Sequence, residues 1–295
     1  MQLIQIIVSG MAQGCIYGLI ALGFVLIYKA TETVSFVQGD LMMVGAFIGL
    51  ACMTMLGFPF WLAVPAAIIG MAVLGFATER LVIRPILGEP AFSIVMLTVG
   101  LGYVLRGLIT MIPGIGTETH SLPVPYKDET FRIGGVVLAA EQLVVIGATA
   151  LLCVVLYGMF RFTRVGVAMQ AVSQNQLAAY YMGIPVKRLN ALVWALAAMM
   201  AAVAGLLLAP ITFVHANMGL VGLKAFPAAV VGGFASLPGA IVGGLIIGVV
   251  ESLAAGYLDP YVGGGTKDFA PYVLMILMLM VRPYGIFGRR QIERV

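Results

Sequence analysis

The chain is divided into apolar stretches of roughly 20 residues, the length that an α-helix needs to cross a lipid bilayer. Short polar segments separate these stretches, and 62% of the residues are hydrophobic whereas only 9% are charged. Soluble domains carry about 25% charged residues. The pattern predicts an all-α polytopic membrane protein, a single transmembrane domain over residues 1–295 with about eight membrane-spanning helices. The predicted spans cover residues 1–28, 41–56, 60–78, 91–112, 142–160, 191–213, 241–258 and 270–281.

The first apolar stretch begins without a basic segment, which indicates an uncleaved membrane span in place of a secretory signal peptide. Within it, Gly10, Gly14 and Gly18 recur every four residues. This spacing places small residues on one face of a helix, where a second helix can approach closely. We therefore expect a close helix–helix contact along this face.

Two stretches interrupt the series of spans. Residues 31–45 are rich in polar side chains, and such density inside a membrane requires irregular backbone that faces protein or water. Residues 224–238 are too short to cross the membrane, and their glycines and proline break helices. We predict a broken helix near residues 31–45 and a re-entrant or short helix near residues 224–238. Interrupted helices in the two halves of a chain point to a binding site near the middle of the membrane.

The basic residues predict the side of the membrane on which each loop lies, because cytoplasmic loops are enriched in lysine and arginine. If residues 224–238 make one extra excursion, most of the 16 basic residues fall on one side. The exceptions are Arg106, Lys127, Arg132, Lys224 and Lys267. The basic side is then cytoplasmic, and the N-terminus is expected outside.

The longest polar stretch on the predicted cytoplasmic side covers residues 161–190, RFTRVGVAMQAVSQNQLAAYYMGIPVKRLN. Ser173 and Gln176 have the spacing of a capping box, in which the serine caps a helix and the glutamine bonds back to it. Gly183 suits the left-handed position after a helix, and Pro185 does not continue one. The pattern predicts a short helix over residues 174–182 that is presented to a partner protein. The alternative is a solvated loop with one chance helical turn.

Polar residues in the apolar regions are candidates for lining a pathway through the membrane. Glu251 lies within an apolar stretch, where a carboxylate is costly in lipid, so it is expected to face the protein interior. There it is either a pathway residue or a structural carboxylate that bonds to a neighbouring helix. The full candidate set is Ser35, Gln38, Gly39, Asp40, Thr212, His215, Asn217 and Glu251.

Sequence signals for catalysis are missing. The chain has no G-x-x-x-x-G-K-[ST] motif for nucleotide phosphates, and GGGTK at residues 263–267 lacks that spacing. His120 and His215 have no partner cysteine or carboxylate at the spacing of a metal site or a catalytic triad. The net charge of +4 reflects membrane topology and does not indicate nucleic acid binding. We expect no enzyme activity, no bound cofactor and no metal site in this chain.

Three long stretches carry a resemblance to a known family: ALGFVLIYKATETVSFVQGDLMMVGAF (residues 21–47), AVSQNQLAAYYMGIPVKRL (171–189) and FPAAVVGGFASLPGAIVGGLIIGVVES (226–252). Over nearly its whole length the chain resembles the permease subunits of branched-chain amino acid ABC importers, of the LivH type. Permeases of such importers carry a cytoplasmic E-A-A-x-x-x-G element. Ala178, Ala179 and Gly183 match it, whereas Leu177 replaces the glutamate.

The resemblance implies that the short helix docks on a separate ATP-binding subunit, through Ser173, Gln176, Leu177, Ala178, Ala179, Tyr180 and Gly183. It also implies a second permease subunit, two cytoplasmic ATP-binding subunits, a periplasmic substrate-binding protein, surrounding membrane lipid and a bacterial inner-membrane location. The expected function is import of leucine, isoleucine or valine, driven by ATP hydrolysis in the partners. The alternatives are a permease for urea, short amides or sugar, and an ATP-independent channel or ion-coupled carrier. A third, an intramembrane enzyme, lacks a plausible nucleophile and base.

Overall fold

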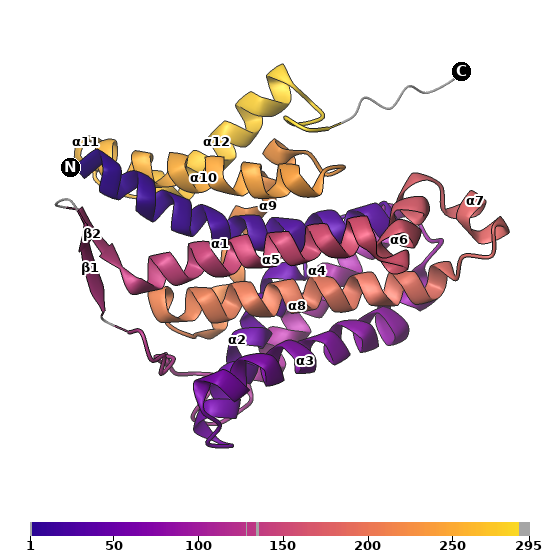
Figure 1. Cartoon of the computed structure of the whole chain (residues 1–295), viewed down its shortest axis with the longest axis horizontal. Coiled ribbons are helices and arrows are strands. Elements are labelled where there is room, and N and C mark those ends of the chain that lie inside the picture. The colour runs from indigo at the N-terminus through magenta and orange to yellow at the C-terminus, as the bar shows by residue number, and fades with distance from the viewer. Residues whose placement is uncertain (1, 128, 134–135, 289–295) are drawn as a thin grey trace.

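The computed structural model describes residues 2–127, 129–133 and 136–288, and these residues are mostly helical (Figure 1). Among them, six helices are long and apolar enough to cross a membrane. The prediction of an all-α polytopic membrane protein is confirmed. The six are α1 (Gln2–Thr31), α3 (Phe60–Thr78), α4 (Ala91–Thr110), α5 (Ala140–Phe162), α8 (Val186–Thr212) and α10 (Leu237–Tyr257).

Three further helices between or beyond these spans are shorter. They are α2 (Gln38–Thr54), α9 (Val221–Gly232) and α12 (Thr266–Val281), with 17, 12 and 16 residues. A 3-10 helix, η3 (Ala216–Leu220), leads directly into α9. Because these segments are shorter than the roughly 20 residues of a full span, the predicted count of about eight spans is not confirmed. The polar connections contain α6 (Arg164–Gln174), α7 (Gln176–Tyr181) and α11 (Asp259–Val262).

The helices α1 and α8 form the centre of the bundle. Their most apolar stretches are 89% and 72% buried, whereas those of α4 and α5 are each 17% buried. The helices α9 and α10 pack on α1, and α2 and α3 pack on α8. The exposed apolar side chains are concentrated on α3, α4, α5 and α12. A broad apolar surface of this kind faces a membrane or another membrane subunit.

The glycine face predicted in the first span packs on α10, as expected. A Cβ added at Gly14 would lie 2.7 Å from the carbonyl oxygen of Gly244, closer than such atoms approach in proteins. On α10, a Cβ at Gly248 would collide with the backbone of α1 at Gly14. The two backbones are therefore in contact, which is the packing that small residues permit between membrane helices.

Each central helix is followed by a break and then by a short helix. After α1, Glu32 has a φ of 55°, and α2 begins at Gln38. After α8, Phe213 has a φ of 62°, and a helical segment of residues 216–232 follows. These are the two non-glycine residues with positive φ in the described part of the chain. The helices α1 and α8 run in opposite directions (Figure 1), and interrupted helices in the two halves of a chain are found at the binding sites of transporters.

Both breaks were predicted from the sequence, but their boundaries differ from the prediction. The first break covers only residues 32–37, and α2 begins at Gln38, three residues before the predicted position 41. The second element begins before residue 224, because η3 and α9 occupy residues 216–232. After α9, the ring of Phe234 lies 5.1 Å from that of Tyr28, near the end of α1. The excursion after α8 is thus a short helix that returns toward the end of the bundle where α1 ends.

The two ends of the bundle carry different structures. The outer end, as we call it, carries the N-terminus and an antiparallel hairpin of β1 (Thr130–Ile133) and β2 (Val136–Ala139) (Figure 1). The inner end carries α6 and α7 (Figure 1). The hairpin was not predicted, because the sequence analysis left residues 113–141 without a span or strand. Arg289, Arg290 and Arg294, which supported the predicted sidedness, lie outside the described residues.

Candidate functional site

The short helix predicted at the cytoplasmic side is α7 at the inner end. Its N-cap is Asn175, whose side-chain Oδ1 accepts a hydrogen bond from the backbone N–H of Ala178 at 2.9 Å. The predicted capping box is therefore wrong. Ser173 lies within α6, where its hydroxyl donates to the carbonyl oxygen of Gln170 at 2.8 Å, as serines inside helices commonly do. The helix begins at Gln176 instead of residue 174, so Ser173 is not part of it.

The end of α7 is a glycine, as predicted. Gly183 has a φ of 81°, and its N–H donates to the carbonyl oxygen of Tyr180 at 3.0 Å. The N–H of Ile184 closes the turn by donating to the carbonyl oxygen of Ala179 at 3.0 Å. Glycine adopts this left-handed conformation without the steric cost that a Cβ brings. The next helix, α8, starts at Val186, five residues before the predicted start at residue 191.

The outward surface of α7 is apolar. Leu177, Tyr180, Tyr181 and Met182, which we call the α7 face, are 70%, 66%, 82% and 82% exposed. Ala179, on the opposite side, is buried against the rest of the protein. Large apolar side chains gathered at a polar end of a membrane protein mark a contact surface for another molecule, and exposed tyrosines are common anchors of such contacts.

Two long side chains hold the surroundings of α7 in place. The Nε2 of Gln176 donates to the carbonyl oxygen of Ala30 at the end of α1, at 2.6 Å. The guanidinium of Arg84 donates to the carbonyl oxygen of Lys187 at the start of α8, at 3.1 Å. Arg84 also forms an ion pair with the buried carboxylate of Glu79, at 2.8 Å. From the sequence, Arg84 counted only as one of the basic residues on the cytoplasmic side, and its contact with α8 was not predicted.

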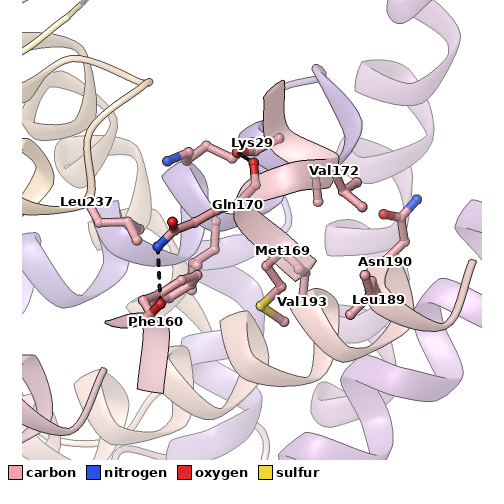
Figure 2. Close-up of a pocket in the computed structure, with 12 residues that line it drawn as sticks. Lys29, Phe160, Met169, Gln170, Val172, Leu189, Asn190, Val193 and Leu237 are labelled. Carbon is pink, nitrogen blue, oxygen red and sulfur yellow. Dashed lines mark hydrogen bonds between the residues drawn. The ribbon is translucent and has the colours of Figure 1, made fainter. Parts of the chain in front are cut away.

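A cleft of about 810 Å³ opens beside α7 at the inner end. It lies between α7, the first break, the segment that joins α3 to α4 and the start of α8. A second cavity, between α1, α6 and α8, holds only about 20 Å³, too little for an amino acid (Figure 2). In Figure 2, Gln170 of α6 reaches the carbonyl oxygen of Phe160 at 3.1 Å, which helps to fix α6 on the end of α5.

Two of the candidate pathway residues, Ser35 and Gln38, are buried in the packing of the central helices. Gln38 is fully buried, and its Nε2 donates to the carbonyl oxygen of Ala197 in α8 at 2.8 Å. The amide also fills the space beside Gly23 of α1, where a Cβ would collide with it. Gln38 thus connects the start of α2 to both central helices. Its Oε1 and the hydroxyl of Ser35 have no hydrogen-bond partner within the described residues.

Gly39 and Asp40 lie where the two interrupted elements meet. A Cβ at Gly39 would collide with the carbonyl oxygen of Gly219 in η3 and come within 2.9 Å of the Cα of Gly222 in α9. Asp40 forms an ion pair with Arg106 of α4 at 2.9 Å. Gly39 therefore permits close packing of α2 on η3 and α9. The partner of Asp40 is Arg106, which the sequence had identified only as a basic residue outside the cytoplasmic side. A charge in a membrane span costs about 3 kcal/mol unless it is compensated, which explains why the two charges are paired.

Glu251 of α10 is buried, as predicted, and it is paired as well. Its Oε1 accepts from the ammonium group of Lys224 in α9 at 3.2 Å, and the same ammonium donates to Asp268 of α12 at 2.7 Å. Its Oε2 has no hydrogen-bond partner within the described residues. This cluster joins the short helix α9 to two neighbouring helices, which favours the structural interpretation of Glu251.

The remaining candidates, Thr212, His215 and Asn217, lie around the second break at the outer end of α8. The hydroxyl of Thr212 bonds to its own helix, to the carbonyl oxygen of Leu208 at 3.3 Å. The backbone of Val214 pairs with that of His120 in the outer loop. The eight candidates therefore do not line one surface. They divide among the first break with the start of α2, the Lys224 cluster, and the second break with η3.

The comparisons with known proteins agree with this architecture. Residues 6–281 match the family model described as branched-chain amino acid transport system / permease component. The chain is 31% identical to the high-affinity branched-chain amino acid transport system permease protein LivH of Salmonella typhimurium, over 99% of this chain and 97% of that protein.

Two further relatives come from other organisms. The permease protein BraD of Pseudomonas aeruginosa is 31% identical over 99% of this chain and 98% of its own length. A probable LivH permease of the archaeon Methanocaldococcus jannaschii is 30% identical over 92% of this chain and 88% of its own length. On the strength of the family match and these full-length relatives, the chain belongs to the family of branched-chain amino acid transport permeases.

Proposed function

We propose that this chain is the membrane-spanning permease subunit of an ATP-driven importer that moves branched-chain amino acids into the cytoplasm. The single observation that supports docking of ATP-binding subunits is the α7 face. It is an apolar surface on a capped helix that is held by Gln176 at the inner end of the bundle (Figure 1). An exposed apolar surface of this kind is typical of a docking site for another protein.

The proposed assembly contains this chain, a second permease subunit, two ATP-binding subunits at the inner end and a periplasmic binding protein at the outer end, in a bacterial inner membrane. ATP hydrolysis belongs to the ATP-binding subunits. Leucine, isoleucine and valine are the proposed substrates because the relatives are named for branched-chain amino acid transport.

Coupling in this assembly requires that the ATP-binding subunits hold α7 differently in two states, since a ligand shifts a conformational equilibrium only through differential binding. Gln176 links α7 to the end of α1, and Arg84 links the end of α3 to the start of α8, the helix that follows α7. Movement of α7 would therefore reach the two central helices. The intramembrane carboxylates Asp40 and Glu251 are each paired with a basic side chain, which argues against an ion-coupled carrier that needs free carboxylates.

The test of this proposal is the double variant Leu177→Asp/Tyr181→Asp. Both side chains are mostly exposed, so the folded permease should accumulate normally in the membrane. We expect recovery of the ATP-binding subunits by affinity purification, and leucine uptake, to fall by at least about tenfold, because central apolar anchors contribute about 2 kcal/mol or more to a contact.

The matched control is Tyr261→Asp, which changes an 88% exposed tyrosine in α11 at the opposite end of the bundle. This variant should retain the ATP-binding subunits fully. Unchanged recovery of the ATP-binding subunits and unchanged uptake in the α7 double variant would refute the proposal. Normal uptake by the wild-type chain in cells that lack the ATP-binding subunits would indicate an ATP-independent channel or carrier instead.

A further inference from the structure

The ion pair between Asp40 and Arg106 lies at the meeting point of both interrupted elements. Asp40 is in the first turn of α2, directly after the first break, and its carboxylate lies beside Gly219 of η3, directly after the second break. Arg106 reaches it from α4, with 2.9 Å between Nη2 and Oδ1. In transporters, interrupted helices in the two halves of a chain place substrate sites at such junctions.

The backbone around the pair leaves room for the carboxylate and little else. A Cβ added at Gly102 of α4 would collide with Oδ2 of Asp40, and one added at Gly219 would lie 2.6 Å from Oδ1. The side chains of Asp40 and Arg106 nevertheless keep 13% and 23% of their surface exposed. The pair is thus framed by glycines on two elements and is not fully enclosed.

Arg106 has hydrogen-bonding capacity that the pair does not use. Its Nε is buried and has no hydrogen-bond partner among the residues that the structure describes. Its guanidinium lies 5.7 Å from the ring centre of Tyr103, which is 69% exposed. A guanidinium that donates to one carboxylate and has a further unpaired N–H can donate hydrogen bonds to a second carboxylate.

The ion pair between Lys224 and Glu251 includes a second carboxylate, unlike the Asp40–Arg106 pair. The ammonium group of Lys224 is shared between Glu251 and Asp268, so it is held by two carboxylates on two helices. The Asp40–Arg106 pair joins one carboxylate to one guanidinium. Because only two charged groups take part, Asp40 and Arg106 can separate without leaving a third charged side chain unpaired.

We propose that Asp40 and Arg106 form a transient site for the zwitterionic head of an amino acid during its passage. Arg106 takes the α-carboxylate, and Asp40 takes the α-ammonium group. This inference rests on the proposed function. The zwitterion exchanges one ion pair for two, so every charge stays compensated, which is a requirement for charges at membrane depth. When the substrate leaves, the two side chains pair again, as they do in the structure.

The direct test uses the permease assembled with its partner subunits in nanodiscs, without the binding protein, and measures thermal stabilisation by three small molecules. Leucine carries both charges, leucinamide lacks the carboxylate and 4-methylpentanoate lacks the ammonium group. We expect saturable stabilisation by leucine only. Asp40→Asn and Arg106→Gln should abolish it, whereas Arg80→Gln, which changes an exposed arginine at the inner end, should keep it. Equal stabilisation by all three molecules, or none by leucine in the wild type, would overturn the proposal.

A second measurement separates substrate binding from a purely structural ion pair. With saturating loaded binding protein, Arg106→Gln should lower leucine uptake by at least about tenfold while the stimulated ATP hydrolysis stays within about twofold of the wild type. More ATP is then spent for each molecule transported. A proportional loss of uptake and ATP hydrolysis would mean a structural pair. If Arg106→Gln fails to assemble, Arg106→Lys keeps the positive charge and should show the same excess of hydrolysis over uptake, because lysine lacks the guanidinium fork.

The proposed function and this site fail in distinguishable ways. An importer with another substrate shows no leucine uptake in the wild type. An importer of branched-chain amino acids without this site shows normal wild-type uptake together with variants that transport and hydrolyse in the wild-type ratio.

Discussion

Arg84 and Glu79 form an ion pair at the inner end of α3, with 2.8 Å between Nη2 and Oε2. The carboxylate of Glu79 is 1% exposed, and the same arginine nitrogen donates to the backbone carbonyl of Lys187 at the start of α8. Residues Glu79–Ile83 form a single π-helical turn that continues α3, a local irregularity that often occurs at functional positions. Through this arginine, the end of α3 is fixed to the first turn of α8, the helix that follows α7.

We expect Arg84→Gln to destabilise the permease by on the order of 2 kcal/mol, because it leaves a buried carboxylate without its charged partner. The melting temperature of the purified complex measures this effect. Uptake should fall further than the loss of folded protein explains, since the contact that fixes the start of α8 beside α7 is lost as well. Arg80→Gln is the control in the adjoining π-helical turn, because Arg80 is exposed. Equal behaviour of the two variants would contradict a special role for Arg84.

Asn175→Ala should loosen α7, because loss of an N-cap costs about 1 kcal/mol. The side chain of Asn175 caps the first turn of α7 through the N–H of Ala178. Ser173→Ala should have a smaller effect on α7, because the serine hydroxyl bonds within α6. Hydrogen exchange of the α7 amides distinguishes the two variants. Faster exchange in Ser173→Ala than in Asn175→Ala would restore the capping box that the sequence pattern predicted.

Gly14→Leu should prevent correct folding, because α1 and α10 are in backbone contact at this position. The matched control is Gly147→Leu in α5, where an added Cβ meets no atom within 4 Å. Membrane abundance and resistance to protease report the outcome. Normal abundance of Gly14→Leu would mean that the backbones of α1 and α10 can separate at this position, which the glycine packing excludes.

The sequence predicted the breaks because their signals are local. Polar residues between apolar spans, and a run of glycines, are visible along the chain. The boundary at Gln38 was placed three residues too late, because this polar side chain is accepted inside a helix by the carbonyl oxygen of Ala197. That partner lies 159 positions away, and no pattern of spacing reveals it. Because the prediction used polarity alone, it counted residues 38–40 as part of the break, although they belong to α2.

The ion pairs at membrane depth were missed for the same reason. Asp40 and Arg106 are 66 positions apart, and Lys224 and Glu251 are 27 apart. The sequence identified Asp40 and Glu251 as costly charges but supplied no rule for choosing their partners. The capping error had a different cause: Ser173 and Asn175 both fit an N-cap, and the choice depended on whether α6 continued through the serine.

Single cysteines test the predicted sidedness in a background that lacks Cys15, Cys52 and Cys153. Thr119→Cys and Gly264→Cys lie in exposed loops of the outer end, and Tyr181→Cys lies in α7 at the inner end. An impermeant maleimide added to intact cells should label only the first two, because the basic residues place the inner end in the cytoplasm. Labelling of Tyr181→Cys from outside would reverse the assignment and remove α7 from contact with cytoplasmic ATP-binding subunits.

The Lys224–Glu251 pair provides a test between a structural and a pathway role for Glu251. Lys224→Met leaves the carboxylate buried and unpaired, which should cost on the order of 3 kcal/mol and lower membrane abundance. The double variant Lys224→Met/Glu251→Gln removes both charges, so abundance should recover. Asp268, the other partner of Lys224, is 62% exposed, and water can replace the lysine there.

Uptake per folded molecule in this double variant then decides the role of Glu251. If Glu251 only fixes α9 to α10, a neutral pair of similar size keeps the short helix in place, and uptake should return to within about twofold of the wild type. The structure favours this outcome, because the carboxylate is buried and already bonded to a lysine that two helices share. Recovered abundance with uptake still lost would show that the substrate requires the charge of Glu251 itself. The pathway would then extend from the Asp40–Arg106 pair across α9 to α10.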